Sequence, residues 1–230
     1  MANTTYESLL PEIIPMVPGC PDSLIENSIR SATIELCEKA GVYKKELDVI
    51  TTTAQIYEYD LEPPSGTAVH KINWVTHKGI DLEPMSTSLL ETRKPKWREA
   101  AYAGTPEYFI KVSQDLFWLV PVPNETTTSS TYVHVQLKPT HTSTACDNEV
   151  MNDYRDAITT GTLFRLLRMP SKDWTDYAGA QAYGTFFLKE VEIAENRARN
   201  ADTAIARSVK YGGIHKAYSL PRNKYGTRRV

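Results

Sequence analysis

Apolar side chains along residues 22–40 recur every three or four positions, which is the period of one helix face. Before them, residues 6–16 form a shorter amphipathic segment, and residues 18–21 (PGCP) predict a turn because proline does not continue a helix. Pro21 suits the first turn of the longer helix, and Gly41 suits its end. The helix face consists of Ile25, Ile29, Ala32, Leu36 and Ala40.

From residue 46 to residue 138 the pattern changes to a period of two, which predicts strands. Short Pro- and Gly-containing segments between them, PPSG at 63–66 and KG at 78–79, predict turns. Residues 84–103 have a mixed pattern with one expected helical turn, and residues 124–131 are expected to form a polar loop. The expected strands are residues 47–49, 56–59, 68–75, 80–82, 108–112, 116–120 and 132–138.

Helical spacing returns after residue 147. One apolar face is expected along residues 150–167, and a long helix is expected over residues 172–209, with Asp173 near its positive end. The pattern predicts an α+β fold in which N- and C-terminal helices form one bundle and a separate antiparallel β lobe is inserted between them. The expected parts are 1–45 and 147–209 for the bundle, 46–146 for the β lobe and 210–230 for an extended C-terminal arm.

The C-terminal arm differs from the rest of the chain in charge. The chain has 26 Lys and Arg, 28 Asp and Glu, and a formal net charge of -2. Seven of the basic residues lie after residue 206, which leaves 19 basic against 28 acidic residues, or -9, for the remainder. No acidic residue follows Asp202. Such an asymmetry indicates an arm with a binding partner of its own.

Known signatures of catalysis and metal binding do not occur in the sequence. There is no Gly-rich phosphate loop or nucleophile elbow, and the five histidines share no metal-ligand spacing. We expect solvated histidines, no metal and no cofactor. Cys20, Cys37 and Cys146 lack zinc spacing, and Cys37 is expected to be a buried free thiol. No run approaches the roughly 20 apolar residues that span a bilayer, and no signal-peptide pattern is present, so we expect cytoplasmic synthesis and no membrane partner.

The arm alternates cations with aromatic and aliphatic side chains. An extended segment of this kind fits a groove on another protein, with alternate side chains entering pockets. Binding of nucleic-acid phosphates and plain disorder are the two other interpretations of a basic terminus. The residues expected to dock on a partner are Tyr211, Ile214, Lys216, Tyr218, Leu220, Arg222, Lys224, Tyr225, Arg228 and Arg229.

Three stretches carry a resemblance to a known family. They are residues 6–21 (YESLLPEIIPMVPGCP), residues 57–72 (YEYDLEPPSGTAVHKI) and residues 104–109 (GTPEYF) continuing to 118–123 (WLVPVP). In this order they resemble the opening helices, the first hairpin and the Gly-x-Pro-x-Tyr hairpin of head-to-tail adaptor (connector) proteins of tailed bacteriophages. The tail-tubular-A-like adaptors of short-tailed phages are the most similar kind. The likeness covers most of residues 6–200.

The resemblance implies a virion structural protein at the head–tail junction, not an enzyme. Family members form a ring, commonly of twelve copies, beneath the portal protein, and double-stranded DNA passes through the lumen without specific binding. The resemblance also implies that the β lobe faces a tail nozzle or tube protein and that the C-terminal arm docks on the portal. Trp97 and Arg98, in the mixed segment 84–103, are expected either to contact that tail component or to belong to an ordinary loop cluster.

Three other functions compete with the adaptor. A nucleic-acid-binding protein would use the basic arm, and its DNA affinity would fall steeply with salt. Another ring or tail-completion protein of the same particle would differ in the partner of the arm. A virion cell-wall hydrolase would need a pair of carboxylates in a cleft, for which the sequence shows no candidate.

Overall fold

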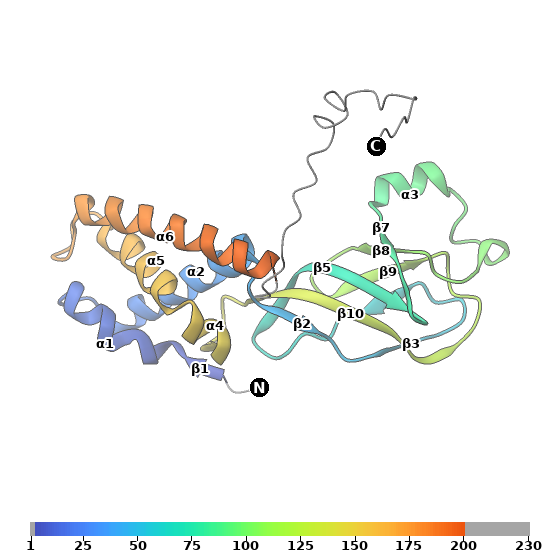
Figure 1. The fold of residues 1–230 in the computed structure, drawn as a ribbon, viewed down its shortest axis with the longest axis horizontal. Coiled ribbons are helices and arrows are strands. Elements are labelled where there is room, and N and C mark those ends of the chain that lie inside the picture. Colours follow the sequence, from blue (N-terminus) through green and yellow to red (C-terminus); the bar gives the residue numbers. More distant parts are fainter. Residues whose placement is uncertain (1–2, 201–230) are drawn as a thin grey trace, which may run out of the picture.

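The computed structural model describes residues 3–200, and the chain folds into a helical lobe and a β lobe that lie end to end (Figure 1). The helical lobe contains segments from both ends of the described chain, as the sequence predicts. Its helices are η1 (Tyr6–Leu9), α1 (Leu10–Ile13), η2 (Ile14–Met16), α2 (Asp22–Ala40), α4 (Asn148–Asp153), α5 (Arg155–Leu167) and α6 (Tyr177–Arg199).

Helix α2 begins and ends close to the predicted positions. Pro21 is the residue before the helix, one position earlier than expected, and Asp22 lies in the first turn. Gly41 ends the helix in the left-handed conformation (φ 61°) and donates its N–H to the Cys37 carbonyl, 3.0 Å away. Glycine adopts this conformation without the steric penalty of a Cβ, so Gly41 is a favourable helix end.

The C-terminal helices differ in their bounds from the prediction. The face expected over 150–167 is divided between α4 and α5 at Tyr154. The long helix begins at Tyr177 and not at 172, because Asp176 caps it: its carboxylate accepts hydrogen bonds from Ala178 and Gly179. Asp173, the expected initiator, lies in the preceding turn. The predicted end at residue 209 lies outside the described residues.

The β lobe holds two sheets. In the first, the order is β2-β10-β5-β6, with β3 also paired to β10; in the second it is β4-β9-β8-β7. Pairing between these strands is antiparallel except for the short parallel pair β7–β8. The strands are β2 (Lys44–Glu46), β3 (Ile50–Thr52), β4 (Glu58–Asp60), β5 (Thr67–His77), β6 (Ile80–Asp81), β7 (Glu83–Pro84), β8 (Tyr108–Lys111), β9 (Leu116–Val120) and β10 (Thr127–Pro139).

Several strand predictions are confirmed and others are corrected. Strands β5, β8, β9 and β10 lie where the period of two placed them. The predicted loop 124–131 is largely part of β10, which begins at Thr127 because β3 pairs with that end of the strand. The strand expected over 47–49 is absent; β2 and β3 flank it instead.

A small sheet within the helical lobe was not predicted from the sequence. Strand β1 (Asn3–Thr5) pairs with β11 (Ala145–Asp147), so the first described residues join the chain just after the β lobe. Next to this sheet, the Tyr6 and Ser143 hydroxyls are hydrogen-bonded at 3.0 Å, and the Arg30 Nε donates to the Ser143 carbonyl at 2.6 Å. These contacts join η1 and α2 to the segment around Ser143, where the chain returns from the β lobe to the helical lobe.

One buried cluster runs through both lobes, so the inserted β lobe shares a core with the helical bundle. It includes Ile29 of α2, Ile158 of α5, and Val69 and Val135 of the first sheet. Two polar contacts also cross the junction: Lys44 donates to the Ala198 carbonyl at the end of α6, and Lys138 pairs with Glu38. A second, smaller cluster lies inside the β lobe and contains Leu90, Trp97, Ile110, Val120 and Val122.

Candidate functional site

The segment between β7 and β8 carries the candidate site of the β lobe. It contains α3 (Thr87–Arg93) and η3 (Ala100–Tyr102), and in Figure 1 α3 projects above the sheets of the lobe. The Ser86 side chain caps α3 by accepting from the Leu89 N–H, and the buried Leu90 fixes the helix to the lobe. The sequence predicted one helical turn in this segment, and the structure has two helical elements.

Trp97 is the centre of an aromatic cluster. Its side chain is only 2% exposed, and its ring lies edge-on to Tyr57 with centroids 5.0 Å apart and 5.5 Å from the ring of Trp118. The guanidinium of Arg98 lies 4.3 Å from the centroid of the Trp97 ring and 5.3 Å from that of Trp118. Such cation–π contacts are favourable because the ring face carries partial negative charge.

Glu91 orients both of these residues. One of its carboxylate oxygens accepts from the Arg98 guanidinium at 3.0 Å and from the Trp97 indole at 3.4 Å. Arg98 itself remains about half exposed. The structure therefore places Trp97 and Arg98, the two residues expected to face the tail, in direct contact, with Trp97 as the buried support and Arg98 at the surface.

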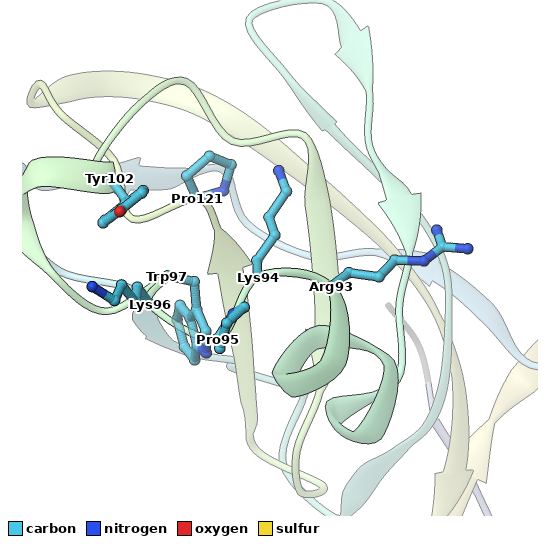
Figure 2. Close-up of a pocket in the computed structure, with 7 residues that line it drawn as sticks. All are labelled: Arg93, Lys94, Pro95, Lys96, Trp97, Tyr102 and Pro121. Atoms are coloured by element: carbon cyan, nitrogen blue, oxygen red, sulfur yellow. The ribbon is translucent and has the colours of Figure 1, made fainter.

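A pocket of about 320 Å³, here called the α3–η3 pocket, opens beside this cluster. Figure 2 shows Pro121 and Tyr102 on one side and Trp97 with Pro95 on the other, with Lys96 next to Trp97. Tyr102 is 54% exposed, so its ring is available to a ligand. The sequence signal for this site was the run RKPKWR at 93–98, but its partners Tyr102 and Pro121 come together only in the fold. The lining residues are Arg93, Lys94, Pro95, Lys96, Trp97, Tyr102 and Pro121.

The pocket rim is basic in an otherwise acidic body. Lys94 pairs with Glu107 at 3.1 Å and lies 4.8 Å from the centroid of the Tyr108 ring. Within residues 3–200, no carboxylate forms an ion pair with Arg93 or Lys96. The site therefore combines apolar walls with cations that are free to meet an anion.

Two histidines of the β lobe are less exposed than predicted, whereas His141 is exposed as expected. His77 is buried and its ring is hydrogen-bonded to the Thr131 hydroxyl at 2.8 Å, and burial lowers the pKa of this imidazole. His134 stacks on Trp74 with centroids 3.7 Å apart. Both imidazoles are thus parts of the sheet packing, because β5 and β10 bring them against neighbouring side chains.

The remaining chemistry-bearing groups have structural contacts. Cys20, Cys37 and Cys146 are buried free thiols, which confirms the prediction for Cys37. Among residues 3–200, no group of three or more His, Cys, Asp or Glu is placed to hold a metal ion. In the same range, no helix has the length and apolar character needed to cross a membrane. All ten residues predicted to dock the C-terminal arm, from Tyr211 to Arg229, lie outside the described residues.

Two comparisons with known proteins bear on this chain. The family model described as SU10 adaptor protein matches residues 4–208, which includes both lobes and the α3–η3 pocket. A search of curated proteins finds no matching protein.

Proposed function

Because the chain belongs to the SU10 adaptor protein family, we propose that it is the head-to-tail adaptor of a tailed phage, joining the portal protein to a tail nozzle or tube protein. The family is one of phage structural adaptors, components of the virion that contact other head and tail proteins. The observation that carries the proposal is the family match over residues 4–208. The order of helices, strands and helices, which resembles known head-to-tail adaptors, supports it.

In this proposal the protein forms a ring, commonly of twelve copies in similar adaptors, with a lumen for double-stranded DNA. Charge supports this role, since residues 1–206 carry 19 basic against 28 acidic residues. Each cation that contacts a phosphate adds affinity for DNA, so an acidic wall lets a duplex pass without holding it.

The C-terminal arm is proposed to dock on the portal. Its alternating basic and aromatic residues suit a groove on a folded partner. A segment that becomes ordered on binding has modest affinity by itself, and many arms on one ring add up to strong attachment. In this arrangement the β lobe faces the tail, and α3 projects from the side of that lobe (Figure 1).

Co-sedimentation with the portal ring of the same phage tests the proposal. Full-length protein and a version ending at Arg207 are each mixed with the portal. We expect only the full-length chain to sediment with the ring, because the truncated chain lacks the arm. If both versions bind equally, the helical lobe and not the arm makes the contact with the portal. If neither version binds, the protein does not lie next to the portal.

The same samples separate the competing functions. If the basic arm grips nucleic acid, the full-length chain alone binds duplex DNA with an affinity that falls steeply with salt, and removal of residues 208–230 abolishes this binding. Another ring or tail-completion protein of the particle would bind a partner other than the portal through the same arm.

A further inference from the structure

We propose that the α3–η3 pocket binds an extended acidic segment of another protein and seats one apolar side chain of that segment against Tyr102 and Pro121, with the buried Trp97 as support. The inference deepens the proposed function and rests on it for the source of the segment, a tail component of the same particle. The chemistry of the pocket is independent of that source.

The walls of the pocket supply the apolar half of this recognition. Trp97 is held in place by Tyr57, Trp118 and Arg98, so the wall exists before a ligand binds. Because the wall is already ordered, binding of a ligand does not require an additional loss of side-chain entropy in the pocket. The volume of about 320 Å³ is at the small end of ligand pockets, which span roughly 300–1,000 Å³. It suits a single side chain with adjoining backbone.

The rim supplies the charged half. Four of the six residues in 93–98 are Lys or Arg. Two of these cations are already paired, Lys94 with Glu107 and Arg98 with Glu91. Arg93 and Lys96 have no such partner among residues 3–200. Figure 2 shows Lys96 next to Trp97, across from Tyr102, and Arg93 pointing away from the pocket. A carboxylate that flanks the apolar anchor of a ligand would meet Lys96, and Arg93 adds positive charge farther from the pocket.

Two other occupants fit the pocket less well. The C-terminal sequence of this chain carries seven Lys and Arg and no acidic residue after Asp202, so a basic rim repels it. Single-stranded nucleic acid binds on exposed aromatic faces that stack with bases. Here the Trp97 ring is 2% exposed and Arg98 covers its face, which leaves Tyr102 as the one exposed ring of the pocket lining.

The test is a selection of peptides on the full-length protein from a random dodecapeptide library. The selected peptides are then synthesised with a fluorescent label and titrated by anisotropy. We expect peptides in which Asp or Glu flank a Leu, Phe, Trp or Met. Lys96→Glu and Tyr102→Ala, both changes of exposed residues, should each weaken their binding about tenfold. Lys189→Glu on α6 is the matched charge reversal outside the pocket, and it should leave the affinity unchanged.

Three results would overturn the proposal. The first is a selection without acidic enrichment, and the second is binding that Lys96→Glu and Tyr102→Ala do not alter. The third is a labelled single-stranded oligonucleotide that binds the wild type and loses affinity in Lys96→Glu, which would assign the pocket to nucleic acid. Portal co-sedimentation of Lys96→Glu keeps the two proposals apart, since a pocket variant should still bind the portal.

Discussion

At the scale of single residues, Gly161 of α5 shows how closely the helices approach. A Cβ at this position would lie 2.8 Å from two ring carbons of Phe187 on α6 and 3.2 Å from the Cβ of Ala32 on α2. These distances are shorter than ordinary van der Waals contact, so the three helices meet at this point only because the side chain is missing.

We therefore predict that Gly161→Ala destabilises the protein, although alanine is the better helix former. Overpacking of this kind costs about 1–3 kcal/mol. Urea unfolding measures the change, and Glu192→Ala on the exposed side of α6 is the control, with an expected effect within about 0.5 kcal/mol. A variant as stable as the wild type would mean that Phe187 moves aside freely.

Glu35 links helices α2 and α5 through an ion pair. It pairs with Arg165 of α5 and with Lys39. Burial by itself would raise the pKa of this carboxyl, but the hydrogen bond from Lys39 and the charge of Arg165 outweigh it, and the pKa lies below its ordinary value of 4.5. Arg165 is the more buried partner, with 14% of its side chain exposed.

We predict that Glu35→Gln lowers the free energy of unfolding by about 1–2 kcal/mol at neutral pH, because it leaves Arg165 without its charged partner. A lowered folded-state pKa stabilises the protein above the ordinary pKa, and the gain is lost as the pH falls through the folded value. The difference between wild type and variant should therefore shrink below about pH 4. Urea unfolding at neutral and acidic pH measures it, and a constant difference would contradict the ion-pair argument.

At the scale of elements, the start of α6 depends on one side chain. The Asp176 carboxylate accepts hydrogen bonds from the N–H groups of Ala178 and Gly179, at 3.1 and 3.0 Å. Asp173 was the expected start of the helix from sequence, since both residues are acidic and precede an apolar helical pattern. The turn formed by Lys172 and Thr175, in which the Thr175 N–H donates to the Lys172 carbonyl, keeps Asp173 outside the helix.

Separate replacement of Asp176 and Asp173 by alanine shows which of the two residues caps α6. Asp176→Ala should destabilise the protein by about 1 kcal/mol, the usual effect of losing an N-cap. Asp173→Ala is the matched control and should change stability by less than about 0.5 kcal/mol. Thermal unfolding followed by circular dichroism measures both, and a larger effect of Asp173→Ala would restore the start predicted from sequence.

The elements also show which patterns were sufficient for prediction. Strand β10 alternates Val133, Val135 and Leu137 with more exposed neighbours, and the structure buries those three. Its first residues are polar Thr and Ser, so the sequence predicted a loop there; they form a strand because β3 lies alongside and pairs with them. Local periodicity is sufficient to predict a strand with one buried face. A polar strand has no such pattern, and its formation depends on pairing with a neighbouring strand.

At the scale of the whole molecule, the two lobes share one core. The cluster that contains Ile29 and Ile158 of the bundle also contains Val69 and Val135 of the first sheet. Lys44 and Lys138 add polar contacts across the junction. A continuous core favours unfolding of residues 3–200 as one cooperative unit, in contrast to two domains joined by a linker.

We predict coincident unfolding of the two lobes in urea. Circular dichroism reports mainly on the helices, and Trp174→Phe restricts tryptophan fluorescence to Trp74, Trp97 and Trp118 in the β lobe. The replacement is mild because the indole N–H of Trp174 is buried without a hydrogen-bond partner. Two separated transitions would show that the lobes are independent and that the shared core contributes little.

The sequence by itself determined the α+β class, the order of helices and strands, the acidic body with its basic arm, and the resemblance to phage adaptors. These follow from periodicity, composition and motif order, which are local properties of the chain. Only the tertiary structure decided that the lobes share a core, that His77 is buried, and that Tyr102 and Pro121 join Trp97 to form the α3–η3 pocket. Those features depend on contacts between residues far apart in the chain, which local patterns do not encode.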